Sequence, residues 1–379
     1  MKKRIIGLFL AATLLIATCG IAVAAQYAVA VSSSKLYQVR VSGSSMSYKK
    51  IFDLGDSSWA RSIATYGNKI LVTEVGSGGS SLRAFTLAGG GVTEEASISM
   101  SGISYANSVA VDSNGGIYVT DGSSTSSAYA YMSSLSDTAH VRTIGTGYAP
   151  LMDVATSDNS AVIISKHRND VDDQSNITTL AGGSVGTTIS LQSGTNYPRY
   201  PVAVAAKSGY AYVVSEVYNN VGTNSAALSR YSISANTVDT PTQLAGFVPT
   251  DIITYTSGPI DYLAMIGRTT SGTLQARRTM LIDGAITTWT TKDLGTDGGV
   301  DFQCAASADG SLLWYSSAGG EYVGATSWTN SLATGTGDDI SGLVAFTTEM
   351  TPVPEPSSLL ALASFGVGAF GFLIKRKGA

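Results

Sequence analysis

Five charged side chains recur at corresponding positions of a repeated pattern, and they are the first candidates for chemistry in this 379-residue chain. Each follows an apolar segment that resembles the second strand of a hairpin. If the repeats form a ring, these side chains lie along one rim and offer a polar or cation-binding face. The alternative is that each fixes the turn that leads to the next strand. The five residues are Glu74, Asp121, Lys166, Glu216 and Arg268.

The longest charged loop belongs to the same rim and runs over residues 166–176. Its carboxylates, Asp170, Asp172 and Asp173, are hard oxygen ligands of the kind that bind Ca²⁺. A solvated surface loop explains the same composition, and we favour it over a calcium site. No other cofactor is expected.

Histidine and cysteine usage restricts other kinds of chemistry. His140 and His167 are the two histidines and lie in different repeats, which excludes a multi-histidine metal site. Cys304 takes the place of an aliphatic residue on a strand, as a small core residue does. A propeller hydrolase or lactonase with a metal at the rim needs several converging carboxylates. The sequence has carboxylates on alternate repeats only, so we favour a binding protein and keep the enzyme as the alternative.

The elements that must position these residues form a repeat of 45 to 51 residues. Each copy has two short strands of alternating apolar residues around a polar turn, as in NSVAVDSNGGIYVTDG at 107–122. Two more strand candidates follow each pair. Four strands at this period are typical of a β-propeller blade. Equivalent first-strand positions are Ile63, Val109, Val154, Val204, Ile253 and Cys304.

The two ends of this repeat region complement one another. Residues 340–346 resemble a first strand with no successors, whereas residues 27–33, 36–42 and 47–55 supply three strands without a first one. Together they make one shared blade that closes a ring. We therefore predict an all-β propeller over 26–347 with seven blades. Six blades are the alternative, because the strands after Glu321 are poorly defined.

The charge balance argues against nucleic acid as a partner. The formal net charge is −4, but removal of the six cations at the two termini leaves 17 cations against 27 anions. A body of that sign repels a phosphate backbone, and no basic stripe offsets it.

The N-terminal segment has the organisation of a secretory signal peptide. Lys2, Lys3 and Arg4 precede an apolar stretch from Ile5 to Val23, and small residues then suit cleavage before residue 25 or 26. We predict that residues 1–25 are removed on export. A retained membrane helix and lipidation of Cys19 are the alternatives.

The C-terminal segment has three consecutive parts. A linker at 348–356 contains Pro354, Glu355 and Pro356, and because proline cannot join a helix ladder it displays the glutamate. Residues 357–374 are uncharged and would span roughly 27 Å as a transmembrane helix. The basic tail at 375–379 stays cytoplasmic by the positive-inside rule. Its cations are Lys375, Arg376 and Lys377.

These three parts, in this order, resemble the PEP-CTERM sorting signal of Gram-negative bacteria. The motif itself is Val353, Pro354, Glu355 and Pro356. The resemblance implies recognition by exosortase, a membrane protease-transpeptidase, and export to the cell surface or an exopolysaccharide matrix. A plain membrane anchor is the alternative.

The best repeat copy also resembles the NHL-type repeat, which implies a propeller but no particular activity. We therefore expect an exported surface or matrix protein whose propeller binds polysaccharide or another surface protein.

Overall fold

The computed structural model describes residues 26–56, 58–88, 91–145, 147–166, 175–191, 198–217, 225–296, 302–306, 310–317 and 322–346. Over these ranges the chain forms strands and turns and no helix, so none of the described segments is a helix able to cross a membrane. The predicted signal peptide, sorting motif, transmembrane helix, basic tail and acidic loop at 167–174 lie outside the described residues.

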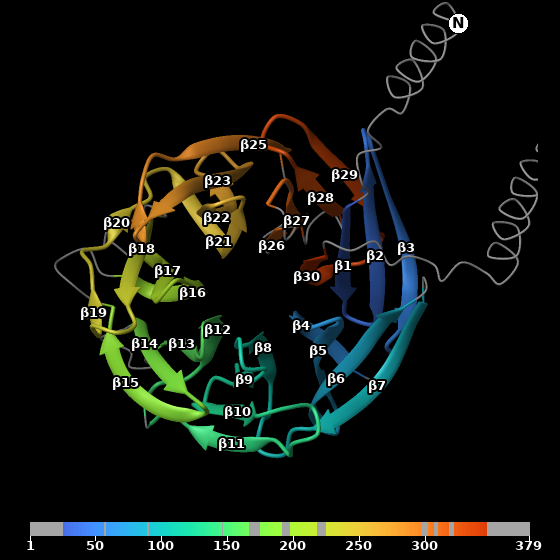
Figure 1. Cartoon of the computed structure of the whole chain (residues 1–379), viewed down its shortest axis with the longest axis vertical. Helices are drawn as coiled ribbons and strands as arrows, with labels where there is room; N and C mark the ends of the chain where they lie inside the picture. Colours follow the sequence, from blue (N-terminus) through green and yellow to red (C-terminus); the bar gives the residue numbers. More distant parts are fainter. Residues whose placement is uncertain are drawn as a thin grey trace, which may run out of the picture.

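Seven antiparallel sheets surround a central axis as the blades of a propeller (Figure 1). The prediction of seven blades is confirmed, and the six-bladed alternative is wrong. The second sheet contains β4 (Ser58–Tyr66), β5 (Lys69–Gly76), β6 (Gly79–Ala88) and β7 (Gly91–Ser99). The third contains β8 (Ala106–Val111), β9 (Ile117–Asp121), β10 (Ala128–Met132) and β11 (His140–Thr143). The fourth contains β12 (Leu151–Ser157), β13 (Ser160–Lys166), β14 (Ser175–Ala181) and β15 (Ser184–Ser190).

The remaining three sheets follow the same order from the axis outward. The fifth contains β16 (Pro198–Lys207), β17 (Tyr210–Val217) and β18 (Ser225–Ser232), to which β19 (Thr237–Val238) and β20 (Thr242–Gln243) pair. The sixth contains β21 (Phe247–Ser257), β22 (Ile260–Thr269) and β23 (Thr273–Ile282), to which β24 (Ala285–Ile286) and β25 (Thr290–Thr296) pair. The seventh contains β26 (Phe302–Ala306), β27 (Leu313–Ser317), β28 (Tyr322–Thr326) and β29 (Ser331–Gly335).

The closing sheet joins the two ends of the described chain. Its innermost strand is β30 (Ile340–Phe346), followed by β1 (Gln26–Ser32), β2 (Lys35–Ser42) and β3 (Ser45–Asp53). β1 and β30 are antiparallel, with Tyr27 opposite Phe346 and Ser32 opposite Ile340. The predicted shared sheet is therefore present, because one C-terminal strand fills the place that the N-terminal strands leave empty.

The first-strand positions read from the repeat all lie on innermost strands. Alternation with period two places their side chains alternately toward the neighbouring sheets, which is why the sequence pattern located these strands. They lie on β4, β8, β12, β16, β21 and β26, at Ile63, Val109, Val154, Val204, Ile253 and Cys304 respectively.

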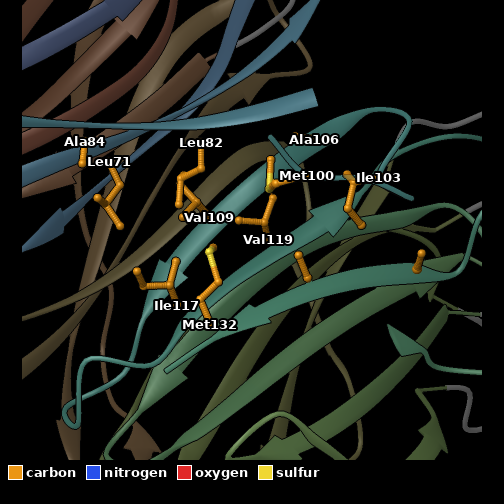
Figure 2. Packing of buried hydrophobic residues seen from close by; sticks show 12 residues of the cluster. Leu71, Leu82, Ala84, Met100, Ile103, Ala106, Val109, Ile117, Val119 and Met132 are labelled. Atoms are coloured by element: carbon orange, nitrogen blue, oxygen red, sulfur yellow. The ribbon is translucent and has the colours of Figure 1, made fainter. Parts of the chain in front are cut away.

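The hydrophobic core lies between adjacent sheets rather than in one central mass. Figure 2 shows Leu71 and Leu82 of the second sheet near Val109 and Val119 of the third, within one cluster of buried side chains. Because both faces of a middle strand contact neighbouring sheets, all five residues of β9 are buried. Removal of this apolar area from water holds successive sheets together.

The ring has two faces that differ in what they carry. The mouth face is the end of the ring where the innermost strands begin and the second strands end. In the second sheet, Trp59 lies near the start of β4 and Glu74 lies near the end of β5. The tail face is the opposite end, where Gln26 begins β1 and Phe346 ends β30. The chain therefore enters and leaves the propeller on the tail face.

Candidate binding site at the channel mouth

A central cavity of about 1350 Å³ lies along the axis of the ring. Among the described residues, its wall comes from the innermost strands β4, β8, β12, β16, β21 and β30, with Glu216 of β17 at its edge. Side-chain hydroxyls and carboxylates are mixed with small apolar groups in this wall. The cavity is larger than the few hundred to a thousand cubic ångströms that usually suffice for one small molecule.

Six of the innermost strands carry a β-bulge close to the mouth face. In the second sheet, for example, Ala60 pairs with Glu74 and Ser62 with Thr73, so Arg61 is an extra residue. A bulge turns the side chains around it away from regular alternation. One residue or pair between shifted pairs in each of these six strands lines the cavity, and these residues are Arg61, Asn107, Ser108, Met152, Val202, Thr250 and Ser341.

Trp59 and Arg61 stand out at the mouth of the second sheet. Trp59 is 64% exposed although it is a large apolar residue, and it lines the cavity. The Arg61 guanidinium lies over the ring of Tyr105, with its Cζ 5.0 Å from the ring centroid. Within the described residues Arg61 forms no ion pair, and its buried Nε has no hydrogen-bond acceptor. Sequence reasoning missed both residues.

Asp121, a predicted rim residue, is fully buried beneath this pair. Its carboxylate accepts hydrogen bonds from the backbone N–H groups of Ser104 at 2.9 Å, Tyr105 at 3.1 Å and Ser123 at 2.9 Å. The carboxylate thereby holds the segment before β8, which carries the Tyr105 ring. Its oxygens face the protein and not the cavity.

Glu74, the corresponding residue of the second sheet, is also buried. It accepts a hydrogen bond from Ser58 at 3.1 Å and one from Arg83 at 2.9 Å. Arg83 also binds Glu94 through two nitrogens, at 2.9 and 2.6 Å, and donates to the carbonyl of Leu54, just after β3, at 3.0 Å. Burial alone would lower the pKa of Arg83, but the two carboxylates raise it overall. This network fixes the strand start next to Trp59.

Asp153 connects three consecutive sheets within the cavity wall. Its Oδ1 accepts hydrogen bonds from Ser108 of the third sheet at 2.5 Å and from the Val154 N–H at 2.8 Å. Its Oδ2 accepts one from the Val204 N–H of the fifth sheet at 3.0 Å. Burial raises the pKa of Asp153, and these three donors offset part of that rise. Asp153 is a third residue that sequence reasoning missed as part of the wall.

The other predicted rim residues are spread around the mouth face. Lys166 ends β13 with its Nζ 3.9 Å from the centroid of the Tyr200 ring. Glu216 is exposed and lines the cavity, whereas Arg268 lies opposite Val248 on β21. The structure thus places all five residues near second-strand ends without bringing them together.

No group of three or more His, Cys, Asp or Glu side chains that could hold a metal occurs among the described residues. Asp170, Asp172, Asp173 and His167 fall outside those residues, so the calcium interpretation of that loop stays a prediction. His140 begins the outer strand β11 and is exposed.

Comparisons with solved structures define the class of protein as a β-propeller. A putative 6-phosphogluconolactonase from Bacteroides fragilis is 12% identical, with a TM-score of 0.57 over 86% of this chain and 99% of that one. A protein from Lactobacillus plantarum gives a TM-score of 0.59 at 12% identity, over 85% and 100% of the two chains. A functionally unknown protein from Desulfotomaculum acetoxidans gives 0.59 at 12% identity, over 85% and 99%. At this identity the likeness concerns the fold alone, and no curated protein matches the chain.

The C-terminal segment gives the more particular result. Residues 352–377 match the PEP-CTERM protein-sorting motif, as the sequence predicted. The chain is therefore an exported protein with a seven-bladed propeller body and a signal that implies processing by exosortase.

Proposed function

We propose that this exported protein is a non-enzymatic binding module of the cell surface or extracellular matrix, and that its principal ligand is a polysaccharide. The observation that carries the proposal is the exposure of Trp59 at the mouth of a large polar cavity. An exposed indole next to hydroxyl and amide groups is the combination that binds sugars, since a sugar ring has apolar C–H faces and a polar edge. The large size of the cavity suits several linked units better than one small molecule.

The support for binding comes from how the mouth is built. Glu74 accepts a hydrogen bond from the side chain of Ser58, next to Trp59, and Asp121 holds the backbone of Tyr105, whose ring lies against Arg61, so the exposed side chains stand beside groups that are already fixed. Fixed contact groups lose little conformational entropy when a ligand arrives. The described carboxylates of the wall do not form a metal-binding group, and the geometry gives no support to a rim-metal hydrolase.

The proposal includes the route to the surface. Residues 1–25 act as a signal peptide, residues 357–374 as a membrane anchor and Lys375 to Lys377 as the cytoplasmic stop. Exosortase then reads the PEP box, and the protein passes to the surface or to the exopolysaccharide matrix. The sorting motif supports this route because it combines the box, the apolar segment and the basic tail.

Trp59→Ala tests the binding site. The purified exported protein is titrated with extracellular polysaccharide from the producing cells and with defined oligosaccharides, by calorimetry. We expect the variant to lose at least tenfold in affinity, because the stacking surface is removed. A tenfold loss corresponds to about 1.4 kcal/mol.

Ile282→Ala is the matched control for this experiment. Ile282 is 58% exposed but belongs to β23, at its end on the tail face. Its removal should leave the affinity unchanged. Equal losses in the two variants, or full affinity in Trp59→Ala, would contradict a site at the mouth.

Glu355→Ala tests the route. The acidic residue of the box is removed while the apolar segment and the basic tail are kept. We expect the precursor to remain in the membrane fraction, which immunoblotting of fractionated cells detects. Normal delivery to the surface would show that the box is not read.

A further inference from the structure

We infer that the polysaccharide bound at the mouth contains isolated acidic sugars, and that Arg61 binds their carboxylate while Trp59 stacks on the sugar ring. The inference rests on the proposed function and specifies the ligand chemistry of the same site.

Arg61 supplies the first step because it is a cation without a protein anion. It is the one Lys or Arg among the described residues that line the cavity, and it forms no ion pair within the described part of the chain. Its Nε is buried and has no acceptor there. A cation in a cavity wall that has no protein anion can pair with an anionic group of a ligand. A carboxylate fits best, since guanidinium binds it through two parallel hydrogen bonds.

The orientation of Arg61 is fixed before any ligand binds. Its guanidinium lies over the Tyr105 ring, and the Tyr105 backbone is held by the buried Asp121. Gly122 leaves room for this arrangement, because a Cβ there would lie 2.9 Å from Asn107 and 3.2 Å from the Tyr105 ring. A planar cation held against an aromatic ring presents its free edge to the cavity mouth.

Trp59 lies two residues before Arg61 on the same strand. The β-bulge at Arg61 interrupts the regular alternation of the strand, so sequence spacing alone does not set the direction of the two side chains. Both nevertheless line the cavity, as does the small buried residue Ala60 between them, so Trp59 and Arg61 contact the same space. A sugar stacked on the indole therefore places its carboxylate next to the guanidinium.

The remaining charges of the mouth set a limit on how acidic the ligand can be. Glu216 and Asp339 are exposed carboxylates of the cavity wall, on other sheets than Arg61. They accept hydrogen bonds from neutral sugar hydroxyls but repel further carboxylates. Like charges facing one another suppress the wrong ligand. The mouth consequently favours one acidic sugar flanked by neutral ones over a continuous polyuronate.

Three hexasaccharides distinguish a ligand with isolated acidic sugars from a neutral ligand and from a continuous polyuronate. The first alternates glucuronic acid with N-acetylglucosamine, the second contains N-acetylglucosamine alone, and the third contains galacturonic acid alone. Calorimetry with the full exported protein at low salt measures the three affinities. We expect the alternating oligosaccharide to bind at least tenfold more tightly than either of the others.

Variants assign this preference to Arg61. In Arg61→Ala, the affinity for the alternating hexasaccharide should fall to that for the neutral one. Arg61→Lys should keep only part of the preference for the alternating hexasaccharide, because lysine cannot form the two parallel hydrogen bonds of a guanidinium. Glu216→Gln should raise the affinity for the galacturonate. Arg40→Ala is the matched control, since Arg40 also lies over a tyrosine, Tyr27, but is exposed on β2 and does not line the cavity.

The outcomes distinguish this inference from the proposed function. Equal or tighter binding of the neutral or the all-acidic ligand, with Trp59 still required, overturns the acidic-sugar inference and leaves polysaccharide binding intact. A preference that survives in Arg61→Ala also overturns it. If no oligosaccharide and no native polysaccharide binds, the proposed function itself fails. Melting curves serve as the folding control. In a chain of this size, a change of about 1 kcal/mol shifts the melting temperature by roughly 2–4 °C or less. A variant that melts within about 2 °C of the parent protein is therefore folded.

Discussion

The closing sheet and the mouth of the second and third sheets both depend on aspartate and glutamate, but they use them differently. In the closing sheet, Asp338 precedes β30 and accepts hydrogen bonds from Lys35, at 2.9 Å, and from Tyr37 of β2. This contact joins the C-terminal strand to the N-terminal ones. At the mouth, Glu74 and Asp121 are buried and hold the segments that carry exposed side chains.

The difference separates ring closure from the recognition that we propose at the mouth. Closure depends on the backbone ladder between β1 and β30, with the partly exposed Asp338 as an additional tie. The proposed recognition uses the buried Glu74 and Asp121, which order the mouth through hydrogen bonds within the protein. Substitutions that weaken closure should therefore lower the unfolding free energy. Substitutions of the buried carboxylates at the mouth should lower both the unfolding free energy and the affinity for the ligand.

Removal of β30 should have the largest effect. A protein ending at residue 339 is compared with one ending at residue 349. Loss of the strand exposes the edge of β1 and removes the buried side chains of Ile340 and Leu343, which alone contribute about 3–6 kcal/mol. We expect aggregation or a strongly lowered melting temperature in calorimetry. Identical melting of the two proteins would contradict closure by the shared sheet.

Glu74→Ala should have an intermediate effect. The change removes a nearly buried partner of Arg83 and frees Ser58, so we expect a loss of about 2–3 kcal/mol in urea unfolding, together with weaker glycan binding. Asp338→Ala should cost only about 1 kcal/mol, because its side chain is 27% exposed.

The control for these two variants is Glu95→Ala. Glu95 pairs with Lys69 on the outer part of the same sheet, with its side chain 36% exposed, and its loss should change the unfolding free energy little because solvent screens the pair. A loss for Glu74→Ala as small as that for Glu95→Ala would show that the buried network does not order the mouth.

Asp153→Asn should have the smallest effect, and it concerns pH. Burial raises the pKa of Asp153 above its usual 3.8, so the folded protein binds this proton more tightly than the unfolded chain does. The unfolding free energy therefore falls as pH rises from about 3.8 through the raised pKa. The asparagine variant should lack this part of the slope in melts between pH 4 and 7. Parallel pH profiles for the two proteins would contradict the assignment.

The fold was more readily predicted from the sequence than the site. Alternating apolar residues and a regular period locate strands, and the spare strand at 340–346 predicts closure. A bulge leaves no comparable signal, because one inserted residue only shifts the alternation. Trp59 and Arg61 therefore read as ordinary strand residues before Ile63.

The second-strand carboxylates show the complementary difficulty. Their position along the strand follows from the repeat, and Glu74 and Asp121 do end their strands near the mouth. Whether such a side chain faces solvent or the interior depends on its partners, such as Arg83 on the adjacent strand β6. Those partners differ from one sheet to the next, so the repeat alone could not indicate them.

The exit of both chain ends on the tail face gives the molecule a direction. The sorting motif begins at residue 352, six residues beyond the partner of Tyr27 at the end of β30. Six chain steps reach at most about 20 Å, which is too short to pass around the body. On the proposed route, while the motif is read at the membrane, the tail face points toward the cell and the mouth outward. Every molecule delivered by that route would then present its open end to the surroundings, where the proposed polysaccharide ligand would reach it.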